Sequence, residues 1–305
     1  MKIGLYPGCS LNGSARDYNE SVFALAKAFD IEFEQVPDWN CCGATAAHNM
    51  NKELSLSLSA RILALAEKHG LADVVVPCAA CYSRLAVTQH ELLHDPVLRN
   101  RVSEIIGMEF KGTTNIMNVI QFVDKFIVDK LEARITKKFN YNVACYYGCL
   151  MVRPAKILKY DRPEDPQSMD VVMKKIGANS LDWGYKVECC GAGLSVSKTD
   201  MVSKLSGKII EDATYRGAEA IIVACPMCHS NLDMRRGDIN SYWKTKFTVP
   251  VIYLTQAIGL AIGLTAKEVG LKRHFVAVNL PEKKDEPVVE KKAKAKQPVV
   301  QEPAE

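Results

Sequence analysis

The sequence lacks the features that most often reveal a cofactor or a macromolecular partner. Its formal net charge is only +4 over 305 residues, which gives no indication of a nucleic-acid partner. It contains no G-x-G-x-x-G fingerprint and no P-loop, so we expect any flavin or nicotinamide to be bound elsewhere than in this chain. These absences exclude the commonest nucleotide-dependent functions.

Long apolar runs are also missing. The longest, residues 251–266, is interrupted by Thr255 and Gln256 and falls short of the roughly 20 residues that a membrane span needs. Residues 1–6 are too short an apolar segment for a secretory signal, because Pro7 follows at once. We therefore expect no membrane span and a cytoplasmic location, where clustered cysteines more often serve metal or redox chemistry than disulfides.

Cysteine, by contrast, is abundant, and ten of the eleven cysteines form two copies of one pattern. Each copy has Gly-Cys, then Cys-Cys-Gly, then C-x-x-C. The first copy comprises Cys9, Cys41, Cys42, Cys78 and Cys81, and the second comprises Cys149, Cys189, Cys190, Cys225 and Cys228. Equivalent cysteines are offset by 140 residues at the first position, by 148 at the pair and by 147 at C-x-x-C. A polar insertion at residues 161–167 accounts for the increase, so we infer a duplicated site.

Short apolar strands alternate with helical patterns in both halves. We expect strands at residues 2–6, 31–36, 73–77, 115–119, 141–147, 185–188, 220–224 and 249–254. We expect helices at residues 16–29, 51–70 and 121–133 and directly after each C-x-x-C motif. Two more helices should begin at a capping box of Ser197 and Asp200 and at Gln256, whereas residues 95–113 remain unassigned.

This alternation predicts an α/β protein of two pseudo-symmetric halves, each a small parallel-sheet, Rossmann-like domain. We place the first domain at residues 1–140 and the second at residues 141–280. Residues 281–305 consist mainly of Lys, Glu, Pro, Ala and Val, without any aromatic residue. Such a segment buries too little apolar surface to offset its ordering entropy, so we expect a disordered tail.

The cysteine motifs follow predicted strands, and ligands of open parallel sheets bind beyond the carboxyl ends of the strands. We therefore expect the five thiols of each half to converge on one rim. Gly43 and Gly191 supply the positive φ that lets two adjacent thiols face one metal. The C-x-x-C pairs begin helices, with Pro226 suited to a first helical position, and free N–H groups there stabilise thiolates.

The number of cysteines leaves the metal open. A structural zinc ion and a cubane [4Fe–4S] cluster each take four cysteines, whereas each half offers five. The fifth is either a spare or an extra ligand, and spacing does not decide which. A thioredoxin-type C-x-x-C leaves Cys41 and Cys42 unexplained, and scattered core cysteines would not repeat. An electron-transfer or scaffold protein with cubane or zinc sites is the alternative to a catalytic one.

The spacings resemble the cysteine-rich CCG domain family, whose pattern is C-x(31–39)-C-C-x(35–36)-C-x-x-C. The first copy has intervals of 31 and 35 residues; the second has 39 and 34, one short of the pattern. Two copies in one chain are most similar to the B subunits of heterodisulfide reductases. The resemblance implies two [4Fe–4S] clusters of the noncubane kind, each held by all five cysteines of one half.

The resemblance further implies a disulfide oxidoreductase. Its substrate would be the coenzyme M–coenzyme B disulfide of methanogenesis or an analogue, cleaved to two thiols by one electron from each cluster. Its partners would be the small iron–sulfur subunit and the flavin-containing subunit of the same complex. A CCG subunit of a lactate, glycolate or succinate-type dehydrogenase is disfavoured, because the chain has no C-x-x-C-x-x-C run.

A few further residues carry weaker expectations. Cys145 has no counterpart in the first half, where Leu5 stands, and we expect it to be a buried strand residue. His229 and His48 are candidate proton donors, although we favour a solvent-facing position for His229. Six basic residues near the cysteine turns are candidates for binding an anionic substrate, with surface solvation the default for each: Arg16, Arg84, Arg153, Lys156, Arg235 and Arg236.

Overall fold

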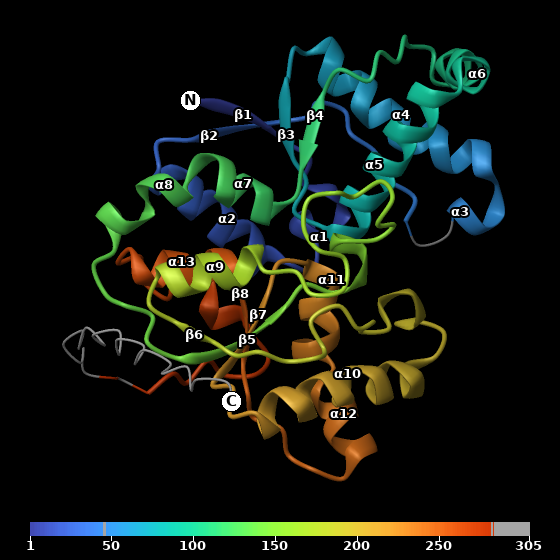
Figure 1. Ribbon diagram of the computed structural model, residues 1–305. Coiled ribbons are helices and arrows are strands. Elements are labelled where there is room, and N and C mark those ends of the chain that lie inside the picture. Colours follow the sequence, from blue (N-terminus) through green and yellow to red (C-terminus); the bar gives the residue numbers. More distant parts are fainter. Residues whose placement is uncertain (45–46, 282, 284–305) are drawn as a thin grey trace, which may run out of the picture.

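The computed structural model describes residues 1–44, 47–281 and 283, and it contains two four-stranded parallel sheets (Figure 1). The strand order is β2-β1-β3-β4 in one sheet and β6-β5-β7-β8 in the other. Equivalent strands thus take equivalent places, which confirms the predicted α/β fold with two similar halves. Most of the predicted tail, residue 282 and residues 284–305, lies outside the described residues.

The elements of the first half are β1 (Lys2–Leu5), α1 (Gly8–Asn12), α2 (Arg16–Ala28), β2 (Glu32–Gln35), α3 (Ala47–Met50), α4 (Lys52–Lys68), β3 (Asp73–Val75), α5 (Ala79–His94), α6 (Pro96–Ile106), β4 (Asn115–Met117), α7 (Val119–Phe126), α8 (Val128–Leu131) and the 3-10 turn η1 (Glu132–Arg134). Those of the second half are β5 (Asn142–Tyr146), η2 (Cys149–Met151), α9 (Ser168–Lys175), β6 (Asn179–Ser180), η3 (Ala192–Leu194), α10 (Thr199–Tyr215), β7 (Ala220–Val223), α11 (Pro226–His229), the π-helical turn η4 (Ser230–Met234), α12 (Arg236–Trp243), β8 (Val251–Tyr253), α13 (Leu254–Ala261) and η5 (Leu271–Arg273). Within the described residues, none of these helices has the length and apolar character needed to cross a bilayer.

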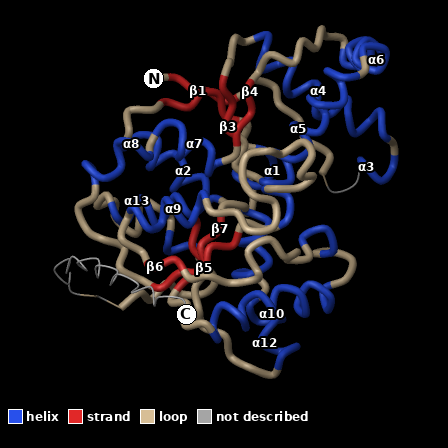
Figure 2. The backbone as a smooth tube through the Cα atoms, viewed as in Figure 1, coloured by secondary structure: helices blue, strands red, loops and turns tan. Residues whose placement is uncertain are grey.

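Helices from both halves fill the space between the two sheets (Figures 1 and 2). There α2 packs against α13, and α7 packs against α9. The Tyr18 hydroxyl in α2 donates to the carbonyl oxygen of Ala224, and its ring stacks on Tyr253 with centroids 4.0 Å apart. Near the end of the described chain, Arg273 returns to pair with Glu20 at 2.7 Å. The buried side chains of the two halves consequently form one continuous hydrophobic core.

Capping residues explain several helix boundaries. The Asn51 side chain accepts from the Leu54 N–H at the start of α4. In the unassigned stretch, Asp95 caps α6, and Gly107 ends it in the left-handed region. A capping box of Asn118 and Gln121 starts α7. The predicted helix at 121–133 is therefore earlier and shorter, and Ile127 separates α7 from α8.

Two local predictions in the second half are wrong. Residues 185–188 form a turn rather than a strand, and the strand is the short β6. The chain leaves β6 early because the Trp183 indole donates to the Cys145 carbonyl oxygen and the Lys186 side chain is drawn into a buried ion pair. The capping box at Ser197 does not form either, because α10 begins at Thr199 with Lys198 as its N-cap residue.

Candidate metal centre

In the first half, the end of each of three strands leads to cysteines. Cys9 lies in α1 after β1, Cys41 and Cys42 lie in the loop after β2, and Cys78 and Cys81 begin α5 after β3. The Sγ atoms of Cys42 and Cys81 are 3.1 Å apart. The thiols of Cys9 and Cys41 also interact, as do those of Cys78 and Cys81. The five predicted thiols of this half are therefore brought together at one edge of the sheet.

The second half repeats these contacts one for one. The Sγ atoms of Cys190 and Cys228 are 3.8 Å apart, the thiol of Cys149 interacts with that of Cys189, and the thiol of Cys225 interacts with that of Cys228. The remaining features are also duplicated: Gly43 and Gly191 have φ of +74° and +82°, and their N–H groups donate to the Sγ atoms of Cys41 and Cys189 at 3.4 and 3.3 Å. The positive φ predicted for both glycines is confirmed.

The two groups of cysteines meet across the boundary between the halves. The thiols of Cys78 and Cys225 interact across this boundary, so the two C-x-x-C motifs lie close together. A cavity of about 220 Å³ opens beside them, lined by all five cysteines of the second half and by Ala44, Ala79 and Ala80 of the first. The rims of the two halves thus face a common space rather than opposite sides of the molecule.

Within these groups, neighbouring thiols favour the thiolate form of two cysteines. The contact with the Cys81 thiol lowers the pKa of Cys42 to about 7, and that with the Cys149 thiol lowers the pKa of Cys189 to about 6. The pKa values of Cys81 and Cys149 are raised, first by these same neighbours and then by burial. All eleven cysteines are free of disulfides. Since thiolates are the species that bind metals, this donor set fits two thiolate-ligated metal centres, and five soft ligands in each half fit iron–sulfur clusters.

Two pairs of side chains that the sequence analysis missed support the Cys-Cys turns. Tyr6 donates to the carbonyl oxygen of Asn40 at 2.8 Å, and Tyr146 donates to that of Glu188 at 2.6 Å, in each case immediately before the Cys-Cys pair. Ser59 and Ser206 donate in the same way to the carbonyl oxygens of Cys42 and Cys190. A signal was present, because the two tyrosines are 140 residues apart and the two serines 147, the offsets of the neighbouring cysteines.

The glycine before the first cysteine of each copy lets the backbone at that point lie close to the C-x-x-C motif. Gly8 and Gly148 both have positive φ, +60° and +70°. A Cβ atom on Gly8 would lie 3.4 Å from the Cys81 Sγ, and one on Gly148 would lie 2.8 Å from the Cys228 Sγ. Any larger residue at position 148 would therefore displace a thiol of the second group.

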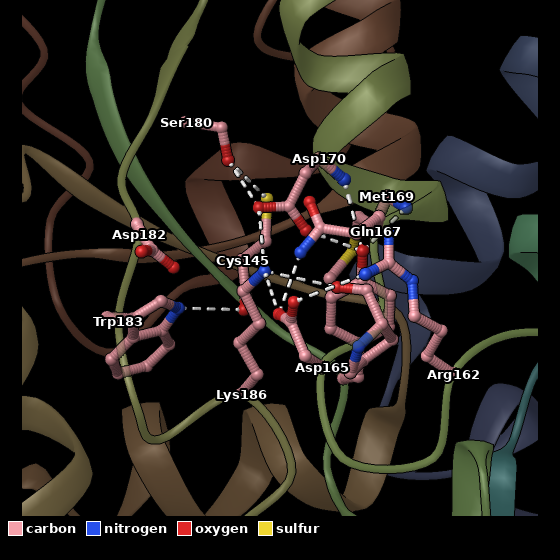
Figure 3. A network of polar contacts seen from close by, with 12 residues as sticks. Cys145, Arg162, Asp165, Gln167, Met169, Asp170, Ser180, Asp182, Trp183 and Lys186 are labelled. Carbon is pink, nitrogen blue, oxygen red and sulfur yellow. Dashed lines mark hydrogen bonds and ion pairs between the residues drawn. The ribbon is translucent and has the colours of Figure 1, made fainter. Parts of the chain in front are cut away.

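The polar insertion of the second half forms a network that braces the loop before Cys149 (Figure 3). The Lys186 ammonium is buried and lies 2.9 Å from Asp165, in the insertion, and 3.4 Å from the buried Asp170. Tyr147 donates to Asp170 at 2.6 Å, and the N–H groups of Tyr147 and Gly148 donate to the Lys186 carbonyl oxygen. Cys145 lies beside this network, fully buried in β5 as predicted.

His229 is not the solvent-facing residue that we favoured from the sequence. It is 4% exposed, its ring stacks on Tyr253, and its Nε2 lies 3.2 Å from the Val251 carbonyl oxygen. Burial lowers its pKa far below the ordinary value, so the imidazole is neutral. The side chain of His48, in α3, lies outside the described part of the structure.

The basic residues singled out from the sequence do not line the cavity between the halves. Arg236 is buried and donates to the carbonyl oxygens of Leu232 and Val249, which makes it a structural residue. Arg153 donates to Val187 and pairs with Glu164. Among the described residues, the cavity lining consists of cysteines, glycine, apolar side chains and Tyr147.

Comparison with known proteins agrees with the duplicated pattern. The family model described as CCG, cysteine-rich domain, matches the chain twice, at residues 3–86 and 143–233. These two stretches contain all ten cysteines of the duplicated pattern and together cover more than half of the chain.

Two relatives match over most of their length. The B subunit of the ferredoxin:CoB-CoM heterodisulfide reductase of Methanosarcina mazei is 30% identical over 282 residues, covering 90% of this chain and 94% of that protein. The 8-methylmenaquinol:fumarate reductase membrane anchor subunit of Wolinella succinogenes is 29% identical over 279 residues, covering 90% of this chain and 97% of that protein.

Among solved structures, a hypothetical protein from Helicobacter pylori has a similar fold. Its TM-score is 0.75 at 14% sequence identity, with 91% of this chain and 52% of that chain covered. The chain thus spans about half the length of that protein, and the likeness concerns the fold alone.

Proposed function

Because the chain belongs to the cysteine-rich CCG domain family and is homologous to the B subunits of heterodisulfide reductases, we propose that it is the catalytic iron–sulfur subunit of a heterodisulfide reductase-type complex. Its reaction would be the reduction of a disulfide, CoM-S-S-CoB or an analogue, to two thiols. The observation that carries this proposal is the close approach of the two C-x-x-C motifs, beside a cavity that is lined by all five cysteines of the second half and by Ala44, Ala79 and Ala80 of the first.

In this proposal each half is a domain, residues 1–140 and 141–280, and each holds one [4Fe–4S] cluster of the noncubane kind through its five cysteines. The ligands of the first would be Cys9, Cys41, Cys42, Cys78 and Cys81, and those of the second Cys149, Cys189, Cys190, Cys225 and Cys228. When bound, each cluster would supply one of the two electrons that reduction of a disulfide requires.

The chain itself contributes the position and the environment of the reacting sulfur atoms. The apolar side chains of Leu150 and Met227 line the cavity with the cysteines, which keeps water from the disulfide. Because the described residues of its lining include no basic side chain, the cavity would take the disulfide, while charged ends of a substrate extend outside it. Electrons would arrive from two partners in the complex, a small iron–sulfur subunit and a flavin-containing subunit. The eleven free thiols support a reducing, cytoplasmic location.

Symmetry-equivalent cysteine variants test the proposal. Cys42→Ser and Cys190→Ser each alter one group of thiols, and Cys145→Ser is a matched control at a buried cysteine outside both. We expect about eight irons per chain in the wild type and the control, about four in each variant, and loss of disulfide turnover by the complex in both variants. Half of the wild-type turnover in either variant, or zinc or about four irons in the wild type, would overturn the proposal.

A second candidate is an iron–sulfur subunit of a quinol-linked reductase complex. It is favoured by the Wolinella succinogenes relative, which is named as the membrane anchor subunit of an 8-methylmenaquinol:fumarate reductase and is matched over 97% of its length. The missing C-x-x-C-x-x-C run therefore does not separate the two candidates. Assays of the purified complex with a panel of disulfides and with a menaquinol analogue do separate them, because the first candidate requires disulfide reduction and the second requires quinol oxidation.

A further inference from the structure

The residue three positions after each C-x-x-C motif differs between the two otherwise matching halves. It is Arg84 in the first half and Asn231 in the second, and their offset of 147 residues is that of the C-x-x-C cysteines themselves. In the first half, α5 continues as a regular helix through Arg84, whereas in the second half the π-helical turn η4 contains Asn231. Such turns are rare and are frequently found at functional sites.

Asn231 is a hydrogen-bond donor to the second group of cysteines. It is 1% exposed, and its amide nitrogen lies 3.0 Å from the Cys190 carbonyl oxygen and 3.7 Å from the Cys190 Sγ. The Ser195 hydroxyl donates to the amide oxygen at 2.9 Å, which fixes the side chain with its nitrogen toward Cys190. A neutral N–H group is therefore held against a sulfur atom of this group.

Arg84 places a positive charge beside the first group instead. It lies on the same face of α5 as Cys81, because residues three apart are neighbours on a helix, and the Cys81 Sγ is 3.1 Å from that of Cys42. The Cys81 thiol is the main cause of the lowered pKa of Cys42, and the charge of Arg84 contributes to it. Arg84 is partly buried, and the acidic residue of the adjoining surface cavity, Glu91, pairs with Lys52. Among the described residues, no carboxylate forms an ion pair with the guanidinium.

A second pair of equivalent residues adds to this difference. The residue immediately before the Cys-Cys pair is Asn40 in the first half and Glu188 in the second. Both backbones are held alike, since a tyrosine hydroxyl donates to each carbonyl oxygen. The Cys149 thiol lowers the pKa of Cys189, and the negative charge of the exposed Glu188 opposes this shift. At these equivalent positions the first half carries one positive charge and the second half one negative charge.

This difference in charge acts directly on the ease of reduction of an iron–sulfur cluster. A cluster becomes more negative when it accepts an electron, so a nearby cation raises its reduction potential and a nearby anion lowers it. A neutral amide donor acts in the same direction as a cation, but through partial charges only. Basic residues near the second group are each paired with a carboxylate: Arg153 with Glu164, Lys186 with Asp165, and Arg235 with Asp238.

Building on the proposed function, which gives each half one iron–sulfur cluster, we propose that Arg84, Asn231 and Glu188 set unequal reduction potentials at the two centres. The centre of the first half, beside Arg84, has the higher potential and is reduced first. The centre of the second half, beside Asn231 and Glu188, has the lower potential and is reduced second. These three residues act on the potentials and take no direct part in bond cleavage.

The test is a redox titration of the full-length protein, purified without oxygen and followed by the absorbance of its iron–sulfur centres. Arg84→Gln should lower the higher of two midpoint potentials by about 59 mV, which is a tenfold change in the equilibrium constant for one electron, and leave the lower potential unchanged. Arg84→Lys should keep the wild-type value, because it keeps the charge. Arg216→Gln, a control at a surface arginine paired with Asp212, should change neither potential.

The variants of the second half should change only the lower midpoint potential. Asn231→Ala should lower it, because the N–H group at the Cys190 Sγ is lost. Glu188→Gln should raise it, by less than the change in Arg84→Gln, because the Glu188 side chain is exposed and its charge is screened by water.

Iron and acid-labile sulfide, measured on the same samples, separate this inference from the proposed function. About eight irons in the wild type with a single shared midpoint potential, or unshifted potentials in an Arg84→Gln variant of full iron content, would overturn the inference alone. So would an equal shift in Arg84→Lys and Arg84→Gln, because packing rather than charge would then be the cause. If Arg84→Gln loses iron, an unchanged lower potential in Glu188→Gln refutes the charge effect. Zinc or about four irons in the wild type would instead remove the proposed function itself.

Discussion

The different clearances at Gly8 and Gly148 give a sharp test of the cysteine geometry. Alanine has a backbone cost at both positions, because both have positive φ, and at Gly148, where ψ is 172°, the conformation is one that essentially only glycine adopts, which costs of order 1 to 3 kcal/mol. The side-chain cost differs: at Gly148 the new Cβ would be 2.8 Å from the Cys228 Sγ, and moving this atom out to the ordinary 3.4 Å is a displacement of about 0.6 Å. A metal site tolerates distance errors of about 0.2 Å. At Gly8 the clearance is already 3.4 Å.

We therefore expect Gly148→Ala to lose the iron of the second half and Gly8→Ala to keep its full iron content. Iron and acid-labile sulfide per chain, measured on protein purified without oxygen, check this. Gly217→Ala controls for the cost of a positive φ, because Gly217 has φ of +78° and no atom within 4 Å of a Cβ. All three variants should melt a few degrees below the wild type. Equal iron loss in Gly8→Ala and Gly148→Ala would refute the reasoning.

Three further predictions concern single residues of the second half. In cluster-free protein at pH 7, iodoacetamide should label Cys189 well before Cys41, because a neighbouring thiol lowers the pKa of Cys189 to about 6 whereas burial raises that of Cys41. Peptide mass spectrometry measures both rates, and that of Cys189 should fall as the pH drops through 6. Lys186→Met should destabilise the fold by about 3 to 5 kcal/mol in urea, because the buried Asp170 carboxylate loses its ammonium partner; Asp170→Asn in the same chain should recover part of this. Tyr146→Phe should cost about 1 to 3 kcal/mol in the same assay, since a part-buried carbonyl oxygen loses its donor, and a loss below about 0.5 kcal/mol would contradict that role.

The arrangement of the cysteines within each half could be predicted from the sequence because it depends on the order of strands and cysteine motifs along the chain. Each cysteine motif follows an expected strand, and parallel strands bring their carboxyl ends to one edge of a sheet. The turn at Gly43 and the helix start at Pro226 follow from residue chemistry at single positions. The helix at Pro96–Ile106 was also accessible, because Asp95 and Gly107 mark its two ends.

Contacts between the halves could not be predicted in this way. Cys78 and Cys225 approach each other only when the halves pack together. The burial of His229 was missed because its ring partners Tyr253 and His274, although in the same half, follow it by 24 and 45 residues, so no local pattern indicates the contacts. Lys186 was missed for a different reason: a lone lysine in a polar stretch indicates an exposed side chain, and its burial is stable only because the insertion supplies Asp165.

The position of α2 between the two sheets has a consequence for synthesis on the ribosome. The Tyr18 hydroxyl finds its acceptor 206 residues later, at Ala224, and Glu20 finds its partner at Arg273. At about 5 to 20 residues per second, roughly 10 to 40 s pass before the first of these partners has been made. During that interval the apolar side of α2 is uncovered in the nascent chain, so we expect newly made first halves to need chaperones until the rest of the protein emerges.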